Sequence, residues 1–336
     1  MGIERESHTH ADLELPEYQC SIRIHKQAVS IYSPSNHFIP HLMGKDDKDY
    51  LHDIPGFKTI HQPLNPNSRV VYIPSEVSTL SYDPETKTMI VRTPPRDVED
   101  GQVLAYLCYW LSEGERQQIQ SFSMHAAATS VDGRGVLIIG DRGSGKTTTL
   151  LALAERYPSK LIANDLVIVH FDEENGRVML EEGSKRIRLR LRSVLSRFPH
   201  LIDHFESLDV PAWTTKVLLE PQKIGVKVEN QPIELSLTAI IHISNVEGED
   251  LVLKRAVGAA PYFELYENLS RIIRGSAISI FNADQNILGY VPSLETEQTH
   301  NNKVAFLNHL MRNKGIWSIS GGNLNKVCEA IYRLSR

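Results

Sequence analysis

The sequence contains few cysteines and no long apolar run. Only three of its 336 residues are cysteine, and Cys20, Cys108 and Cys328 lack the number and spacing of a disulfide framework or a metal site. No apolar stretch approaches the ~18 residues that span a membrane, and the first fifteen residues lack the apolar core of a signal peptide. We therefore expect a cytoplasmic protein that is neither secreted nor inserted in a membrane.

The sequence also lacks a large excess of charge of either sign. Its 36 basic and 41 acidic residues give a formal net charge of −5, and apolar residues make up 41% of the chain. A mildly acidic chain is not suited to binding nucleic acid or anionic lipid along its whole surface, so we expect neither as a partner. The length predicts about two domains, and the composition is compatible with a homo-oligomer.

Hydrophobic periodicity divides the chain into a tail and two domains. Residues 1–16 are polar and are expected to be mobile. Residues 17–118 hold short alternating segments, an irregular stretch at 33–68 and an amphipathic helix at about 100–117, which predicts a small β-rich α+β domain. Residues 119–336 alternate strands with helices, which predicts an α/β domain.

The second domain begins with a predicted hairpin. Strands are expected over 122–131 and 135–140, with Asp132-Gly133 between them as the turn. Because this hairpin precedes a glycine-rich loop, the sheet is expected to be mixed rather than purely parallel. Further helices are expected at about 146–156, 191–199, 259–273, 296–313 and 323–335, and strands at about 160–170, 177–180, 215–219, 223–228, 235–243 and 316–319.

The strongest functional signal is the run Gly140-Asp141-Arg142-Gly143-Ser144-Gly145-Lys146-Thr147. It fits G-x-x-x-x-G-K-[ST] between a predicted strand and a predicted helix. The glycines let successive N–H groups point at phosphate oxygens, and the following helix adds its N-terminal dipole. Lys146 would contact the β- and γ-phosphates, and the Thr147 hydroxyl would bind Mg²⁺. The segment from Gly140 to Thr148 is therefore predicted to bind ATP with Mg²⁺.

This motif alone does not separate the classes of nucleotide-binding proteins. GTPases usually carry Asn-Lys-x-Asp, but the Asn-Lys pairs that begin at 302, 313 and 325 are not followed by Asp two positions later. Motor ATPases usually carry an apolar strand that ends in Asp-Glu, and no such strand is evident. Both classes are therefore disfavoured.

His125 is a second candidate for the site. If residue 131 faces 134 or 135 across the hairpin, then His125 faces residue 140 or 141, at the start of the loop. A histidine there can bind the γ-phosphate or orient an acceptor hydroxyl. The alternative is a core histidine whose hydrogen bonds are satisfied by backbone groups.

A polar pair, Asn164-Asp165, interrupts the apolar segment 161–169. Buried polar groups need partners, and Mg²⁺ is a natural partner for the carboxylate of Asp165. The alternative is an aspartate at a bulge or turn of the strand, although the regular apolar flanks argue against it.

Three features together resemble the HPr kinase/phosphorylase family. They are His125 on the strand before the loop, a loop entered from a hairpin, and Asn164-Asp165 on the next strand. The chain is more similar to the HPr-kinase-like proteins found beside peptide-modifying enzymes, in detail over about residues 120–172. The resemblance implies an α/β P-loop kinase core with a mixed sheet, related to phosphoenolpyruvate carboxykinase. It also implies phosphoryl transfer to a hydroxyl, often that of serine.

The resemblance also implies roles for single residues. Asp165 would match the second member of the family's Asp-Asp pair, and His125 would match its upstream histidine. Asn164 stands where the family has the first aspartate, and Thr147-Thr148 stand where it often has Ser-Glu. The Pro-Gly-Arg-Asn run of the bifunctional kinase/phosphorylases is not found, which puts phosphorolysis and the HPr substrate in doubt.

Residues 186–192 alternate strictly between arginine and an apolar residue. As a strand, this segment would place Arg186, Arg188, Arg190 and Arg192 on one face. Such a face can bind nucleotide phosphates, a phosphorylated product or an acidic peptide. The alternative is a solvated edge that prevents aggregation.

These observations predict an ATP- and Mg²⁺-dependent kinase that acts on a hydroxyl of a peptide, protein or small metabolite. Lys146 and the loop amides would neutralise the phosphates, and Thr147 and Asp165 would hold Mg²⁺. Asp165 or His125 would receive or direct the acceptor proton, and Asn164 would orient it. A nucleotide-binding switch without transfer chemistry and a hydrolytic ATPase are the alternatives.

Overall fold

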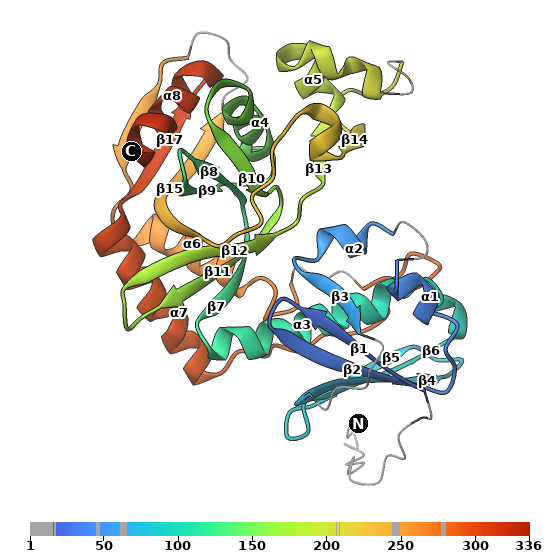
Figure 1. The fold of residues 1–336 in the computed structure, drawn as a ribbon. Coiled ribbons are helices and arrows are strands. Elements are labelled where there is room, and N and C mark those ends of the chain that lie inside the picture. The colour runs from blue at the N-terminus through green and yellow to red at the C-terminus, as the bar shows by residue number, and fades with distance from the viewer. Residues whose placement is uncertain are drawn as a thin grey trace, which may run out of the picture. The chain divides into compact units, whose positions relative to one another are not determined.

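The chain forms two compact units in the computed structural model (Figure 1). The first comprises Met1–Leu51, Phe57–Ser112 and Ile273–Leu294, and the second comprises His52–Gly56, Glu113–Ile272 and Glu295–Arg336. The structure describes residues 16, 18–44, 48–60, 66–205, 207, 209–243, 249–276 and 280–336. Residues 1–15 of the predicted tail lie outside this set. Among the described residues, no helix combines the length and the apolar character needed to cross a bilayer.

The first unit contains a six-stranded mixed sheet with the order β3-β1-β2-β4-β6-β5. Strands β2, β4 and β6 run parallel, and the remaining pairs are antiparallel. β4 is buried on both faces, because Val70, Val71 and Tyr72 are all fully buried. The strands are β1 (Tyr18–Ile24), β2 (Gln27–Ser33), β3 (Phe57–Ile60), β4 (Ser68–Pro74), β5 (Thr79–Asp83) and β6 (Thr88–Thr93).

Helix α3 (Gln102–Gln118) matches the helix predicted at about 100–117. The division between the two units falls inside α3, between Ser112 and Glu113. The stretch expected to be irregular holds strand β3 and two short helices, α1 (Ile39–Leu42) and α2 (Tyr50–Asp53). Elements of four residues are too short to leave a periodic signal in the sequence.

The second unit is built on a nine-stranded mixed sheet, so the predicted α/β class and mixed sheet are confirmed. Its main path is β10-β8-β9-β15-β12-β11-β7, and β17 pairs with β15 and β16. β9, β15 and β17 run parallel, and the other pairs are antiparallel. The strands are β7 (Ser121–His125), β8 (Ala127–Val131), β9 (Arg134–Ile139), β10 (Ser159–Ala163), β11 (Leu166–Asp172), β12 (Arg177–Gly183), β15 (Ile233–Ile243), β16 (Val252–Arg255) and β17 (Ile316–Gly321).

Helices cover this sheet on both faces (Figure 1). Val136 and Ile138 of β9 pack into one core with α4 and α8. Leu137 and Ile139 of the same strand pack into a second core with α6 and α7, as the two-residue period of a strand requires. The helices are α4 (Lys146–Arg156), α5 (Leu191–Arg197), α6 (Ala259–Ser270), α7 (Glu297–His309) and α8 (Leu324–Ser335).

Two segments predicted as continuous strands are broken. The first is divided at Ala126 into β7 and β8, and the second is divided at Asn164-Asp165 into β10 and β11. β7 pairs with β11, whereas β8 pairs with β10. The two segments therefore pair with each other on both sides of the breaks, which places the two breaks side by side.

The predicted arginine strand is also shorter than expected. β13 ends at Arg190, and α5 begins at Leu191, so Arg192 lies on a helix and not on the strand. β13 (Ile187–Arg190) pairs with β14 (Lys216–Leu219) in a separate two-stranded sheet. No strand forms at 223–228: the 3₁₀ turn Pro221–Ile224 includes its start, and Val228 forms only an isolated bridge with Leu161.

Candidate functional site

The glycine loop, residues 140–147, connects β9 to α4 and is shaped by close backbone approach. Gly140 and Gly145 have positive φ angles of 147° and 100°. A Cβ on Gly140 would lie 2.5 Å from the Ile241 carbonyl oxygen, and one on Gly145 would lie 2.5 Å from Ile243 Cγ1. Glycine is therefore required at both positions so that the loop can pass the end of β15.

Backbone hydrogen bonds hold the second half of the loop. Ser144 N donates to the Asp141 carbonyl at 3.1 Å, and Ile243 N donates to the Ser144 carbonyl at 2.8 Å. Ser144 is buried, and its Oγ has no hydrogen-bond partner among the described residues. No side chain caps the N-terminus of α4 at Gly145. The N–H groups of its first turn, which have no partner within the helix, can therefore donate hydrogen bonds to an anion.

Lys146 turns back over the loop that precedes it. Its Nζ donates to the carbonyls of Gly140 and Asp141, at 2.8 and 3.2 Å. Burial lowers the pKa of Lys146, and the charge of Asp165 opposes that shift. Of the two residues that follow, Thr147 is half-buried and Thr148 is buried. The loop thus holds an ammonium group at its centre, within electrostatic reach of a carboxylate.

The two strand breaks bring His125 and Asp165 together. His125 Nδ1 lies 3.3 Å from Asp165 Oδ1, and their side chains are 25% and 63% exposed. Ala126 N donates to the Asp165 carbonyl at 3.0 Å, which fixes the two breaks to each other. The predicted pairing of His125 with residue 140 or 141 is wrong, because β7 leaves the hairpin at Ala126 and His125 faces Leu166.

The surroundings of His125 favour the neutral imidazole over the protonated one. Burial lowers its pKa, the Asp165 carboxylate opposes this, and the charges of Lys146 and Arg271 lower it further. A neutral imidazole has one nitrogen that donates and one that accepts a hydrogen bond. When Nδ1 donates to Asp165, Nε2 remains as an acceptor.

Asn164 points into the protein rather than toward the loop. It is buried, its Nδ2 donates to the Arg186 carbonyl at 3.2 Å, and its backbone N donates to the Ser184 carbonyl at 2.9 Å. The neighbouring Asp165 is largely exposed. The structure therefore brings Lys146, Asp165 and His125 together and gives Asn164 a different environment.

Helix α6 contributes residues that the sequence did not suggest. Asn268 Oδ1 accepts from His125 N at 2.7 Å, and Asn268 Nδ2 donates to the His125 carbonyl at 3.1 Å. Arg271 lowers the pKa of both His125 and Lys146. Burial raises the pKa of Glu264, with further influence from Asp141 and Lys146. The spacing of Glu264, Asn268 and Arg271 marks one polar helix face, a signal that could have been found.

The predicted arginine face is divided among several partners. Arg186 is buried against Glu220 at 2.6 Å, and Arg188 pairs with Asp53 at 2.8 Å. Arg192 lies over the Trp213 ring, 3.3 Å from its centroid. Arg190 is turned toward the loop: its Nη1 would lie 3.9 Å from a Cβ on Gly143.

The residues near the loop fit a nucleotide and Mg²⁺. There is no room for a side chain at Gly140 or at Gly145, as a phosphate-binding loop requires. Thr147 and Asp165 supply the hard oxygen ligands that Mg²⁺ prefers, alongside substrate phosphates. Within the described parts of the chain, no three His, Cys, Asp or Glu side chains form a metal cluster.

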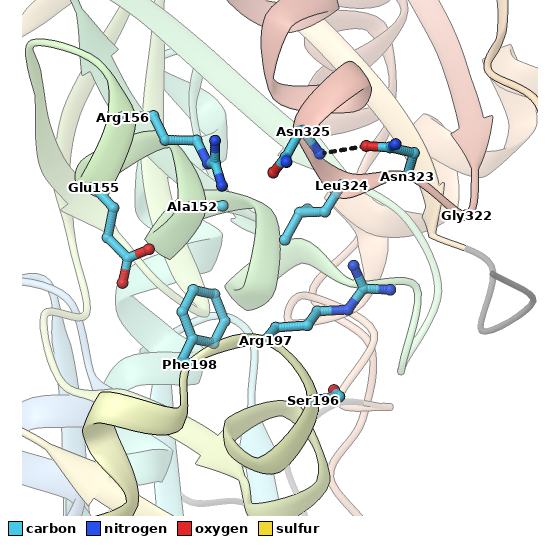
Figure 2. A pocket seen from close by; sticks show the side chains of 10 residues that line it. All are labelled: Ala152, Glu155, Arg156, Ser196, Arg197, Phe198, Gly322, Asn323, Leu324 and Asn325. Carbon is cyan, nitrogen blue, oxygen red and sulfur yellow. Dashed lines mark hydrogen bonds between the residues drawn. The ribbon is translucent and has the colours of Figure 1, made fainter. Parts of the chain in front are cut away.

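A separate pocket of about 300 Å³ lies between α4, α5 and the start of α8 (Figure 2). Arg156 and Arg197 line it, with Asn325 at the first turn of α8. Asn323 caps that helix through hydrogen bonds from the backbone N–H groups of Asn325 and Lys326. The pocket contains none of the predicted site residues.

Comparison with solved structures gives distant similarities, one of which is described here. The structure of the Hpr(Ser) kinase/phosphatase from Coxiella burnetii is similar over 40% of this chain and 77% of that chain, with 16% identity and a TM-score of 0.25. No protein-family model and no curated protein matches this chain. The functional assignment therefore rests on the residues described above.

Proposed function

We propose that the chain is an ATP- and Mg²⁺-dependent P-loop kinase that phosphorylates a serine-like hydroxyl of a peptide, protein or small metabolite. The observation that supports this most is the position of Asp165, whose charge acts on both Lys146 and His125. A lysine in a glycine loop, a carboxylate and a neutral histidine are groups suited to phosphoryl transfer to a hydroxyl.

The glycine loop and the first turn of α4 would bind the phosphates. Lys146 would exchange its bonds to the carbonyls of Gly140 and Asp141 for bonds to phosphate oxygens. Bound Mg²⁺ and ATP would supply the transferable phosphoryl group and offset its charge, and Thr147 and Asp165 would hold the metal. Because the glycines are fixed by close approach, the loop is preorganised for this role.

Asp165 and His125 would manage the acceptor proton. As the acceptor oxygen bonds to the γ-phosphorus, the bond from that phosphorus to the bridging oxygen breaks and its electron pair leaves with ADP. The hydroxyl proton passes to the Asp165–His125 pair, whose members lie within 3.3 Å of each other. Asn164 would act through the backbone bend that carries Asp165, since its amide is already bonded to the Arg186 carbonyl.

The decisive experiment incubates the purified chain with Mg²⁺ and ATP labelled in the γ-phosphate, with and without a mixture of peptides and small metabolites. Transfer of label to an acceptor is the expected result. Release of free phosphate alone would indicate a hydrolytic ATPase, and tight binding without turnover would indicate a switch.

Four variants make this experiment specific to the site. Lys146→Ala should abolish nucleotide binding. Asp165→Asn and His125→Gln should keep nucleotide binding and lower transfer, by ~100-fold or more for Asp165. Asp172→Asn is the matched control, since Asp172 ends strand β11, which begins directly after Asp165, and this variant should transfer normally. Full transfer by both Asp165→Asn and His125→Gln would refute the assigned roles.

A further inference from the structure

The antiparallel strand pair β13–β14 presents positive charge on one face. Ile187 and Leu189 of β13 are buried in the core, so Arg188 and Arg190 project from the opposite face. Arg190 faces Lys216 directly across the two strands. Residues opposite each other in an antiparallel pair have their side chains on the same face.

Arg142, Arg190 and Lys216, near this strand pair, have no carboxylate partner among the described residues, and Arg192, which also lacks one, stacks on the Trp213 ring instead. We call the first three the cation cluster. They differ from the neighbouring arginines, since Arg186 and Arg188 each pair with a carboxylate. Like charges held together without a counter-charge are unfavourable, so such a cluster marks a place for an anion.

The cation cluster lies beside the proposed site. Arg142 belongs to the glycine loop, and Arg190 approaches Gly143 of the same loop. The pKa of Lys216 is lowered, first by burial and then by the charges of Arg190, Arg142 and Arg188, while Asp165 opposes the shift. The charge of Asp165 also acts on Lys146 and His125, so the cluster and the proposed catalytic groups feel the same carboxylate.

We infer that the cation cluster of Arg142, Arg190 and Lys216 binds an anionic group of the acceptor, so that the substrate is a hydroxyl compound that also carries a phosphate. This inference rests on the proposed kinase function. Guanidinium groups bind phosphate oxygens in a bidentate manner, and three cations match the charge of a phosphate better than that of one carboxylate.

The cluster serves the acceptor rather than ATP because the nucleotide phosphates already have partners. Lys146, which bonds to two carbonyls of the loop, and the uncapped first turn of α4 are the groups proposed to bind them. Arg190 and Lys216 belong instead to the β13–β14 strand pair, and the charge of Asp165 acts on Lys216. An anion bound there would hold the acceptor hydroxyl next to the carboxylate.

The test measures binding of inorganic phosphate by calorimetry to the full chain saturated with a non-hydrolysable ATP analogue and Mg²⁺. Saturable phosphate binding is expected, in the millimolar range typical of a small ion. The Arg190→Gln/Lys216→Gln double variant should weaken it at least tenfold and should still bind the analogue. Arg192→Gln, from the same segment but stacked on Trp213, is the matched control and should bind phosphate normally.

Other outcomes separate this inference from the proposed function. Unchanged phosphate affinity in the double variant, or loss of phosphate binding once the analogue is present, would overturn the acceptor site and leave the kinase proposal standing. If the analogue fails to bind the chain, and the double variant still loses phosphate binding, the kinase proposal is overturned instead. Acetate that binds as tightly as phosphate would overturn the preference for a phosphorylated acceptor over a carboxylate.

Discussion

Burial, one carboxylate and two cations, Lys146 and Arg271, set the protonation of His125. Burial lowers its pKa, and the carboxylate of Asp165 raises it. The Asp165 side chain is 63% exposed, so solvent screens its charge, and the effect of burial is the larger one. The folded state therefore keeps His125 neutral at a pH where the unfolded chain begins to bind a proton.

This protonation predicts how stability depends on pH. Because the unfolded chain binds more protons below about pH 6.5, the free energy of unfolding should fall as pH decreases toward the lowered pKa. His125→Gln should lose this contribution and show a flatter dependence. Urea unfolding at several pH values, with an NMR titration of the imidazole, measures both effects. A pKa for His125 above that of an exposed histidine would contradict the prediction.

Gly145 and Gly133 allow the effect of close packing to be separated from backbone strain. Both have positive φ, 100° and 77°, but a Cβ on Gly133 would meet nothing within 4 Å. Gly145→Ala should lower the free energy of unfolding by ~1–3 kcal/mol more than Gly133→Ala, because only the former clashes with Ile243.

The same pair of glycine variants reports on the loop. Gly145→Ala should also lose nucleotide binding, whereas Gly133→Ala, in the β8–β9 turn, should retain it. Urea unfolding and binding of a fluorescent nucleotide test the pair. Equal effects of the two substitutions would show that close approach to β15 does not shape the loop.

Individual site residues differed in how far they could be predicted. The glycine loop is a local pattern, so its position and the helix after it follow from adjacent residues. The orientations of Asn164 and Asp165 do not follow from adjacent residues. Neighbouring side chains in a bend point in different directions, and contacts with distant residues decide which one is buried. Ser184 and Arg186, which bond to the backbone and amide of Asn164, lie about twenty residues away.

Strand β7 is the end strand on the main path of its sheet, and side chains satisfy its free edge. Ser123 N donates to Glu113 Oε1 at 2.9 Å, and His125 N donates to Asn268. Arg116 bonds both to Glu113 and to Ser123 Oγ. Alternate N–H groups of an edge strand point outward and need such partners, so these contacts determine where His125 lies.

Asn268→Ala should therefore reduce both stability and transfer. It leaves the N–H and carbonyl of His125 without their side-chain partner, at a cost of ~1–3 kcal/mol. Asn302→Ala is a matched control, since Asn302 Nδ2 likewise donates to backbone carbonyls, those of Gln117 and Gln118. The control should lose stability but keep its transfer rate per folded molecule. Equal transfer rates in both variants would contradict a positioning role for Asn268.

The elements were predictable where their pattern was long and periodic. Helices α3, α4 and α8 and the β8–β9 hairpin lie where the periodicity and the Asp132-Gly133 turn placed them. The break at Ala126 was not predicted, because the residues on either side are apolar and alternation continues through it. A turn at Asn164-Asp165 was only the disfavoured alternative to a continuous strand, because the apolar flanks are regular, and the structure shows that the strand is broken there. The two segments stay paired with each other, and what changes at the breaks is the strand on the other side, β9 beside β8 and β12 beside β11. Such long-range pairing leaves no local signal.

The chain has two units, and the residues proposed to bind the nucleotide all belong to the second unit. The first unit also takes in Ile273–Leu294, which periodicity grouped with the second domain. The place of this segment in the first unit depends on contacts between residues distant in sequence. For example, Leu80 Cγ of β5 lies 3.0 Å from the position that a Cβ on Gly289 would take. Single-sequence periodicity does not reveal such returns of the chain.

Nucleotide binding should consequently protect the two units unequally. A ligand at a hundredfold excess over its Kd stabilises the state that binds it by ~2.7 kcal/mol. Hydrogen exchange with Mg²⁺ and a non-hydrolysable ATP analogue should slow in peptides from the glycine loop, from α4 and from the end of β15. Peptides from β1 and β2 should be unchanged, because the proposed ligand contacts lie outside the first unit. Lys146→Ala should remove the protection, and equal protection of both units would show that the first unit contributes to nucleotide binding.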